Sequence, residues 1–585
     1  MTDLIFGLVS GVGAFVLGSA VLGRLLGPQA AAVLSYLASL LIFLAVVGGA
    51  KALRSYARGA HPEEKHGLAR YFSFDVDHKV VGIQYTAAAL IVFLVGGLMA
   101  LIMRLELARH GLQFLSPQQY NSIMTMHGIS MVIVALIATA GGLGNFVVPL
   151  QLGARDMAFP RMNALSFWLL PPAVLLLLAA PLSGGLDFGW TAYAPLSTQG
   201  STVGKIYFFL AFITAGFSSI FSGVNFLATA LTMRARGMSW TRIPAFTWSV
   251  ISAAIIQIMG TSVVAASLIM VIFDRILHTS FFNPELGGNA LLYQHLFWYY
   301  SHPAVYIMIL PAFGAILEII PVYARKPLFA YKLVIASFLA ITALSFVVWA
   351  HHMFTSGMWM LLKLPFMINT ELISIPTGVV FLAVMGTLWR ARMRLDSPML
   401  WALAMTANFL IGGLTGIPLA DAPTDLHLHD TWFIVAHFHF TIMGGAVFGF
   451  FAGFHHWFPK MTGRRLNEAL AKTQCALMFV GFNAVFIPLF WLGSHGMRRH
   501  VADFPAWMDP VQTFASAAAL LVAASVVLFI FNVIRSLRTG ENAGDNPWEA
   551  ITLEWKAPSP PPHGNFKTPP VVDRDPYDYG VASKA

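Results

Sequence analysis

Charge is scarce in this chain of 585 residues, because Asp, Glu, Lys and Arg together make up only 10% of it. A soluble globular protein carries about 25% charged residues. Hydrophobic residues account for 57%, and many apolar runs exceed the ~20 residues that a helix needs to cross a bilayer. The composition therefore excludes a soluble globular protein and predicts an all-α polytopic membrane protein.

Cysteine is almost absent, since Cys475 is the only one. A single thiol excludes a disulfide framework and a cysteine-based metal site within the chain. The sequence also lacks an internal repeat strong enough to indicate an inverted-repeat transporter. The net charge of +9 does not indicate nucleic acid as a partner, because the basic residues lie in short loops between apolar runs.

The apolar runs predict fourteen membrane spans in four regions. The regions are an N-terminal pair of spans (1–55), a basic cytoplasmic segment (56–80), a twelve-helix core (81–536) and a proline-rich cytoplasmic tail (537–585). The spans are expected near 3–26, 31–52, 81–104, 121–150, 163–185, 205–233, 246–274, 291–322, 332–355, 366–390, 398–418, 431–458, 472–494 and 510–536. We expect the first span to be a retained anchor rather than a cleaved signal.

Alternate loops differ in charge, which predicts how the chain is oriented. Basic residues gather in one set of loops: Arg234, Arg236, Arg242, Arg325, Lys326, Lys332, Arg390, Arg392, Arg394, Lys460, Arg464, Arg465 and Lys472. By the positive-inside rule these loops are cytoplasmic. The basic segment and the tail fall on the same side, which supports the span count.

Six histidines inside predicted spans are the main chemical signal. They are His127, His302, His351, His352, His437 and His439. Ionisable groups are costly at membrane depth, so they suggest a functional site. One membrane histidine can simply hydrogen-bond a neighbouring helix, but six in four spans favour metal binding. Tyr306 lies four residues after His302, so the two side chains share one face of a helix.

The spacing of His437 and His439 points them roughly 200° apart on one helix. They therefore suit two planar cofactors on opposite sides, and haem is the natural candidate because imidazole is its common axial ligand. A haem with two axial histidines suits electron transfer, and His127 can supply the additional ligand. A haem with one histidine keeps an open position for chemistry. The remaining three histidines would bind copper, zinc or iron.

Several motifs resemble subunit I of the haem–copper oxidases, the terminal oxidases of aerobic respiration. They are Trp298–Tyr306, Trp349–His352, Val435–His439, Gly142–Asn145, Asp156–Asn163, Ile375–Gly378 and His429–Thr431. The resemblance covers roughly residues 70–560 and leaves out the two N-terminal spans. It implies four-electron reduction of O₂ to water, coupled to proton pumping, in a prokaryotic inner membrane.

The resemblance also implies roles for individual residues. The redox ligands would be His127 and His439 for a low-spin haem, His437 for a high-spin haem, and His302, His351 and His352 for copper. Tyr306 would be linked to His302 and would supply an electron and a proton during O–O cleavage. Outside the redox centre, His429 and Asp430 match a magnesium or manganese site, and Asp425, Trp190, Arg498 and Arg499 match the haem-propionate region. The Met497–Arg498 stretch lacks one residue of the usual pattern.

The first proton path departs from the common family pattern. Where most members carry a glutamate two residues after the copper histidine, this chain has Ala304. One branch of the A-class cytochrome c oxidases has a Tyr-Ser pair instead, which Tyr300 and Ser301 match. Hydroxyls can pass protons along waters. The other landmarks remain: Asp156 at the cytoplasmic mouth, then Asn145 and Asn163, although the asparagines could equally join helices by hydrogen bonds.

The second proton path is less complete. Its lysine is replaced by Val380 and its serine by Leu317, while Thr377 remains. Two acids in the same helices, Glu318 and Glu371, are candidate replacements, with Glu371 roughly 13 Å along the helix from the lost lysine. Glu371 could equally line a water-filled cavity without carrying protons. The sequence does not show how protons reach Tyr306.

The electron donor is expected to be cytochrome c or a similar carrier. The positions of a quinol site hold non-matching residues, namely Val95, Met99, Gln119 and Ser122. A partner subunit II must carry the binuclear copper centre, since this chain lacks its cysteine cluster, and subunit III-like membrane partners are expected.

Nitric oxide reduction is the nearest rival function, favoured by Glu371 and the missing lysine but not by Tyr306 or Asp156. A quinol oxidase and a non-redox transporter are more remote. Haem types and pumping stoichiometry stay open.

Overall fold

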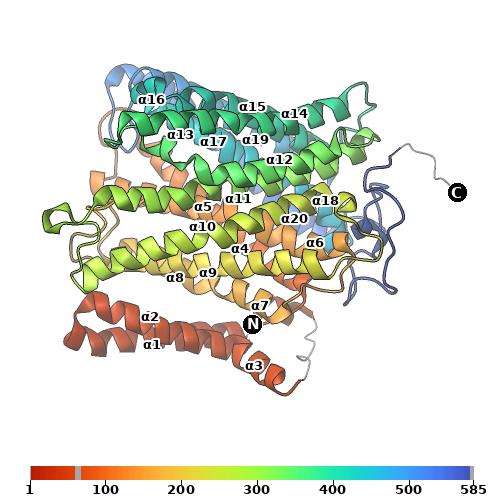
Figure 1. Cartoon of the computed structure of the whole chain (residues 1–585), viewed down its shortest axis with the longest axis horizontal. Coiled ribbons are helices and arrows are strands. Elements are labelled where there is room, and N and C mark those ends of the chain that lie inside the picture. The colour runs from red at the N-terminus through yellow and green to blue at the C-terminus, as the bar shows by residue number, and fades with distance from the viewer. Residues whose placement is uncertain (1, 60–66, 580–585) are drawn as a thin grey trace.

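The computed structural model describes residues 2–59 and 67–579. Within these ranges the chain is helical and forms no β-strand, only isolated bridges such as that between Thr431 and Arg498. Fourteen helical segments of the described chain are long and apolar enough to span a membrane, which confirms the predicted number. They run side by side along one common direction (Figure 1).

The core helices follow one another through the bundle. They are α4 (His78–Glu106), α5 (Pro117–Leu136), α6 (Asn145–Leu152), α7 (Pro160–Trp168), α8 (Leu170–Ala179), α9 (Val203–Thr232), α10 (Ala245–Ile276), α11 (Ala290–Ala324), α12 (Tyr331–Leu344), α13 (Met360–Leu372), α14 (Ser374–Leu388), α15 (Ser397–Ala420), α16 (Ala422–Leu428), α17 (Trp432–Thr441), α18 (Phe448–Thr462), α19 (Glu468–Ser494) and α20 (Asp509–Thr539). Pairs such as α5 and α6 belong to one span.

Helix starts are set by local sequence. Ser116 and Gln119 form a capping box before α5, and the Asp77 side chain accepts from the backbone N–H of Lys79 at the start of α4. Such caps satisfy backbone N–H groups that have no partner within the helix. Polar caps therefore fix where the apolar runs become helices.

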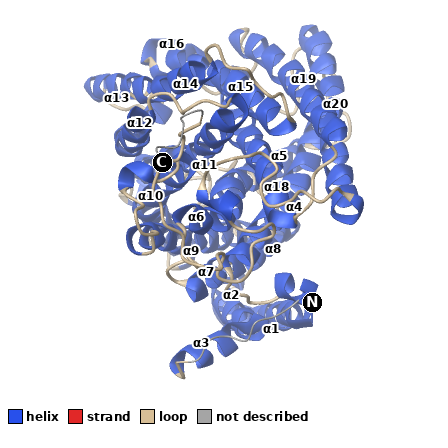
Figure 2. Ribbon diagram, turned by 90° about the vertical axis from the view of Figure 1, so that its right-hand side faces the viewer, coloured by secondary structure: helices blue, strands red, loops and turns tan. Residues whose placement is uncertain are grey.

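α11 lies inside the bundle, which is why its sequence is apolar on all sides. In the most apolar 18-residue stretch of α11, 89% of the residues are buried, the highest share among the spans of the described chain. Figure 2, which views the bundle end-on, shows α11 surrounded by other helices. A helix that is hydrophobic all round belongs in such a core. The motif Trp298–Tyr306 therefore sits at the centre of the molecule.

Three irregular turns interrupt the spans close to the predicted site residues. Two are π-helical, at Ile137–Gly144 and Ile442–Val447, and one is a 3-10 turn at Trp349–Met353. π-helical turns are rare and often occur at functional sites. The 3-10 turn carries His351 and His352, so these two histidines do not follow the geometry of a continuous α-helix.

The two N-terminal helices form a separate layer beside the core. α1 (Thr2–Leu26) packs on α2 (Pro28–Leu44), and the short α3 (Ala50–Ala57) follows (Figure 1). Gly27 joins α1 and α2 with φ at 80°, a conformation that glycine adopts without strain. Tyr36 of α2 hydrogen-bonds Thr214 of α9 at 2.8 Å, which fixes the layer to the core.

The tail, residues 540–579, packs across one end of the bundle, which we name the tail end (dark blue in Figure 1). Its backbone is mostly irregular, as its prolines predict. It is nevertheless anchored, because Trp548, Trp555, Tyr577 and Tyr579 are buried. Basic loops lie at the same end: Arg325 pairs with Glu549 at 2.6 Å and Arg242 with Asp575 at 3.2 Å.

Candidate metal and proton-transfer site

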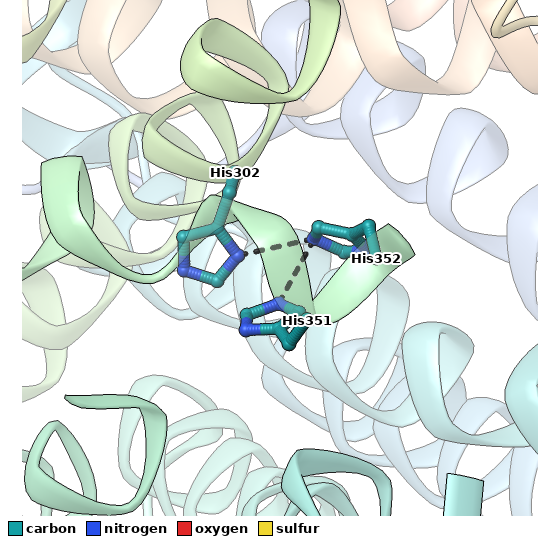
Figure 3. Close-up of side chains that lie close together, drawn as sticks. All are labelled: His302, His351 and His352. Atoms are coloured by element: carbon teal, nitrogen blue, oxygen red, sulfur yellow. Dashed lines mark hydrogen bonds between the residues drawn. The ribbon is translucent and has the colours of Figure 1, made fainter. Parts of the chain in front are cut away.

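Three imidazoles converge at the middle of the core (Figure 3). His302 projects from α11, while His351 and His352 come from the 3-10 turn. His302 Nδ1 lies 3.2 Å from His352 Nε2, and His351 Nε2 lies 3.0 Å from the same atom. Among the described residues, this is the only group of three or more His, Cys, Asp or Glu side chains close enough to share a metal ion.

The chemistry of this histidine triad fits a bound cation. Each neutral imidazole has one lone pair for a metal, so three nitrogens turned toward one another form a ligand set. No carboxylate of the described chain joins them in the cluster. An all-nitrogen set suits copper, zinc or iron, and copper is the ion that the sequence resemblance implies.

Neighbouring side chains orient the triad. The Thr370 hydroxyl donates to the Phe366 carbonyl at 2.5 Å, so it accepts the N–H of His351 Nδ1 at 3.0 Å. That bond leaves His351 Nε2 with the lone pair that a metal needs. Trp298 stacks on His352 with ring centroids 3.7 Å apart and an interplanar angle of 11°. Thr370 was not predicted from the sequence, since nothing local marks it as a partner of His351.

Tyr306 lies directly beside the triad. Its ring centroid is 4.8 Å from that of His302, one helical turn away on α11. The predicted sharing of a helix face therefore brings the phenol next to an imidazole of the histidine triad. The rings are inclined by 61°.

His127 of α5 and His439 of α17 form a second pair. Their rings are nearly parallel, at 10°, with centroids 6.4 Å apart. Each Nδ1 faces a backbone carbonyl, Gly96 O at 2.9 Å for His127 and Val435 O at 2.8 Å for His439. Because Nδ1 donates in both rings, both Nε2 atoms carry lone pairs, and two parallel imidazoles of this kind fit the axial ligands of one haem.

His437 faces a different helix from His439. Its Nδ1 lies 3.2 Å from the Thr415 hydroxyl of α15, and the ring packs against Gly416. A Cβ at position 416 would lie 3.1 Å from the His437 ring, so glycine permits the close approach. His437 and His439 thus have different neighbours, as ligands of two separate cofactors would.

The loop after α16 holds the residues predicted near a second metal and the haem propionates. His429 Nδ1 lies 2.9 Å from Asp425, whereas Asp430 pairs with Arg499 at 2.5 Å. Burial acts to raise the pKa of Asp430, but the charge and hydrogen bond of Arg499 together with the charges of neighbouring histidines lower the pKa overall. The two predicted ligands, His429 and Asp430, therefore have different partners here.

Two further predicted residues lie close to this loop. The backbone of Arg498 bridges that of Thr431, and Trp190 packs edge-on against Trp298 with centroids 5.9 Å apart. Trp190 also lies against Gly128, next to His127. Trp190 therefore lies between Trp298 and the helix of His127, and Arg498 is fixed to the loop through the backbone of Thr431.

Asp156, the predicted start of the first proton path, lies in the loop between α6 and α7. Burial, and then the negative charge of Asp77, raise the pKa of Asp156 to about 7. A carboxyl group with such a pKa can both take up and release a proton near neutral pH. Asp156 is therefore suited chemically to the predicted role.

Asn145 and Asn163 are fully buried further along this path. Both polar atoms of the Asn163 side chain, and Oδ1 of Asn145, lack a hydrogen-bond partner among the residues that the structure describes. Buried polar atoms of this kind are commonly satisfied by ordered water. Asn145 Nδ2 does donate to Gly141 O, at 2.7 Å, but Gly141 lies four residues earlier in the same span, so this bond does not join two helices.

Tyr300 and Ser301 lie on α11 beside the triad and are both buried. The Ser301 hydroxyl has no hydrogen-bond partner within the described chain. Ala304, at the position of the usual glutamate, is buried as well. A free hydroxyl at this depth is available to a chain of waters.

The second path shows mainly apolar surroundings. Val380 lines a small apolar cavity with Phe313 and Ile316. The Thr377 hydroxyl donates to the Ile373 carbonyl of its own helix at 2.9 Å. Glu371 is only partly buried. Within the described part of this region, no side-chain hydrogen bond connects Tyr306 to the tail end.

Glu318 lies at the far end of α11, with partners that sequence reasoning missed. Its Oε1 accepts from the Tyr577 hydroxyl at 2.5 Å and from the Phe246 backbone N–H at 2.9 Å. Glu554 of the tail is also buried, and accepts from Gln151 at 3.1 Å. Tyr577 lies 259 residues from Glu318, so no local pattern could have revealed the contact.

Most of the chain is similar to known proteins. Residues 80–542 match the family model described as cytochrome C and quinol oxidase polypeptide I. Cytochrome c oxidase subunit 1 of Thermostichus vulcanus is 48% identical over 512 residues, 87% of this chain and 93% of the relative. The subunit of the same name from Synechocystis sp. is 45% identical over 521 residues, 89% and 94% of the two chains. A solved heme-copper terminal oxidase dimer has a similar fold, with a TM-score of 0.67, 18% identity, and coverage of 79% of this chain and 84% of that one.

Proposed function

This chain belongs to the family of cytochrome c and quinol oxidase polypeptide I, and we propose that it reduces O₂ to water with electrons from cytochrome c. The single observation that carries this proposal is the histidine triad beside Tyr306. The sequence similarity identifies a terminal oxidase subunit, and the triad supplies the ligand set that its chemistry needs.

The proposed copper and haem ligands are the histidines described above. His302, His351 and His352 would hold copper, His437 would hold a high-spin haem, and His127 with His439 would hold a low-spin haem. When bound, these cofactors supply the electron transfer and the O₂ reduction. The chain fixes each imidazole: Thr370 orients His351, Trp298 stacks on His352, and backbone carbonyls orient His127 and His439.

Protons are the substrate that side chains of this subunit must deliver. We propose that Asp156 takes them up at its carboxylate and that Asn145 and Asn163 order the waters beyond it. The hydroxyls of Tyr300 and Ser301 would then pass protons toward the triad, in place of a glutamate. The support is the raised pKa of Asp156 and the unpartnered polar atoms at positions 145, 163 and 301 within the described chain.

Tyr306 is proposed to donate a proton and an electron from its phenol at the triad. Its position one turn from His302 supports this role. Thr377 and Glu371 would belong to a second path that returns a proton to Tyr306. The side chains around Val380 are apolar, so Thr377 and Glu371 would be the polar groups of that path.

A second metal and partner subunits complete the proposed enzyme. His429 and Asp430 would hold magnesium or manganese with ligands from outside this chain, and Asp425, Trp190, Arg498 and Arg499 would surround the haem propionates. Subunit II would bring electrons from cytochrome c through a binuclear copper centre, and subunit III-like chains would cover the lipid-facing sides. The Tyr-Ser pair supports our proposal that the enzyme belongs to the corresponding A-class branch.

Oxygen consumption by the purified complex tests the function. We expect rapid, cyanide-sensitive turnover with reduced cytochrome c, little with quinol, and about one copper for every two haems in this subunit. Turnover of nitric oxide in place of O₂, or a quinol rate equal to the cytochrome c rate, would contradict the proposal. The Tyr306→Phe variant should bind its metals normally and lose steady-state turnover.

A further inference from the structure

The tail reaches the loop that carries Asp156. Gly153, just before this loop, packs so closely against Leu553 and Pro570 of the tail that a Cβ there would lie 2.8 Å from Pro570. Its φ of 70° also favours glycine. The backbone N–H of Val572 donates to Arg236 O at 2.9 Å, which fixes the tail to the next loop. The tail is therefore a fixed cover over this part of the tail end.

Asn565 is the polar side chain that the tail inserts there, and it is fully buried. Its amide group lies 2.8 Å from His78 Nε2 and donates to Ala154 O at 2.9 Å. Its Oδ1 accepts from Lys79 Nζ at 3.0 Å. One tail residue thus joins the start of α4 to the loop of Asp156.

His78 carries this connection further. It is fully buried, and its Nδ1 lies 2.7 Å from the backbone carbonyl of Asn145. Since Nε2 faces Asn565, the imidazole links the tail to the helix turn that presents the Asn145 side chain. Lys79 Nζ is held by both Asn565 and Asp77, the latter at 2.9 Å.

The pKa of Asp156 depends on the charged groups around it and on how completely the tail shields it from water. Asp77, which contacts Arg70, Lys79 and His563, raises the pKa of Asp156, while Lys79 lowers it. Burial is the largest cause of the raised pKa. Water admitted at this position would weaken both burial and the influence of Asp77.

We propose that Asn565 is a positioning residue of the proton path, which closes the tail over Asp156 and holds His78 and Lys79 in place beside it. The tail then sets how readily Asp156 takes up a proton from solvent. The proposal rests on the proposed role of Asp156 as the first proton acceptor. Asn565 itself carries no proton, so its effect is on the pH dependence and not on the metals.

The test compares pH profiles of O₂ consumption and proton uptake by the purified complex. In Asn565→Leu the tail loses the three polar contacts of Asn565. We therefore expect the pH at which each rate falls to half its maximum, on the alkaline side, to move down by roughly one pH unit. The haem spectrum and the copper content should not change. Asn565→Asp keeps the oxygen that Lys79 contacts and should give a smaller shift. Thr568→Ala, at an exposed tail position, is the matched control and should leave the profile unchanged.

Asp156→Asn separates this proposal from the one on which it depends. Loss of proton uptake in Asp156→Asn, together with a wild-type profile in Asn565→Leu, overturns the role of Asn565 alone. Full proton uptake in Asp156→Asn overturns the path itself. If Asn565→Leu fails to assemble with its haems, the test relies on the Asn565→Asp variant. In that case, a pH profile of Asn565→Asp identical to that of the wild type overturns the proposal.

Discussion

At the scale of single residues, the site depends on hydrogen bonds that select one tautomer of three of its six histidines. Thr370 accepts from His351, and two backbone carbonyls accept from His127 and His439. These contacts free the opposite ring nitrogen for a metal. The histidines themselves could be found from the sequence because ionisable groups inside apolar runs are rare. Their partners could not, since threonines and carbonyls are common in such helices.

Thr370→Val should weaken copper binding. The variant keeps the shape of the side chain but removes the acceptor of the His351 N–H. Loss of such a supporting contact typically costs about 10–100-fold in metal affinity or activity. Metal analysis after dialysis would measure the copper content. Thr473→Val, at an exposed position on α19, is the control, and equal copper retention in both variants would contradict the assigned role.

Ser301→Ala should slow turnover without changing the metals. The Ser301 hydroxyl is buried and has no partner within the described chain, so it is free to bond water. Losing one hydrogen bond of roughly 1–1.5 kcal/mol from a proton relay corresponds to about a 5–10-fold lower rate. Stopped-flow proton uptake would detect this. Ser267→Ala on α10, whose hydroxyl bonds its own helix, should keep the wild-type rate.

At the scale of elements, glycines decide where helices cross. The backbone of α4 meets the π-helical turn and α6 so closely that a Cβ at Gly82 would lie 2.8 Å from Phe146 N and 2.9 Å from Gly142 O. The sequence predicted the helices but not this crossing, because a glycine in an apolar run looks the same on a lipid-facing side and at a contact. Only the packed bundle distinguishes Gly82 from Gly97, which has nothing nearby within the described chain.

Gly82→Ala and Gly97→Ala therefore form a matched pair on α4. Overpacking at Gly82 should lower the free energy of unfolding by about 1–3 kcal/mol, because the clash is with backbone that cannot move aside. Gly97→Ala should be neutral or stabilising by up to about 1 kcal/mol, as alanine favours helix. Thermal loss of the haem absorbance would report both. Similar midpoints in the two variants would rule out the proposed crossing constraint.

At the scale of the whole molecule, the tail ties distant segments together. Glu554 is buried beside the core, and burial raises its pKa above the ordinary value. Glu318, Tyr577 and Lys460 surround the same region, with Lys460 Nζ held by the Ala557 carbonyl at 2.6 Å. Ionising an acid in such a place costs free energy, so the attachment of the tail should depend on pH.

The direction of this pH dependence follows from the raised pKa of Glu554. Stability contributed by protonated Glu554 is full below the pKa of the unfolded chain, and is lost as pH rises through the folded pKa. Limited proteolysis of the tail should thus become faster in the wild type as the pH rises through the raised pKa of Glu554. Glu554→Gln, which imitates the protonated acid, should flatten that dependence. A Glu554→Gln profile parallel to wild type would show that other groups control the tail.

The sequence by itself determined the membrane-spanning class, the number of spans and the histidines, because hydrophobic length and the cost of buried ionisable groups are local properties. It also marked Tyr306, through a spacing of one helical turn. The tertiary structure decided which histidines meet, where His351 and His352 leave the α-helix, and that Glu318 faces the tail and not Tyr306. It alone brought Asn565 to Ala154 in the loop that carries Asp156, since contacts between residues hundreds of positions apart depend on packing and leave no local pattern.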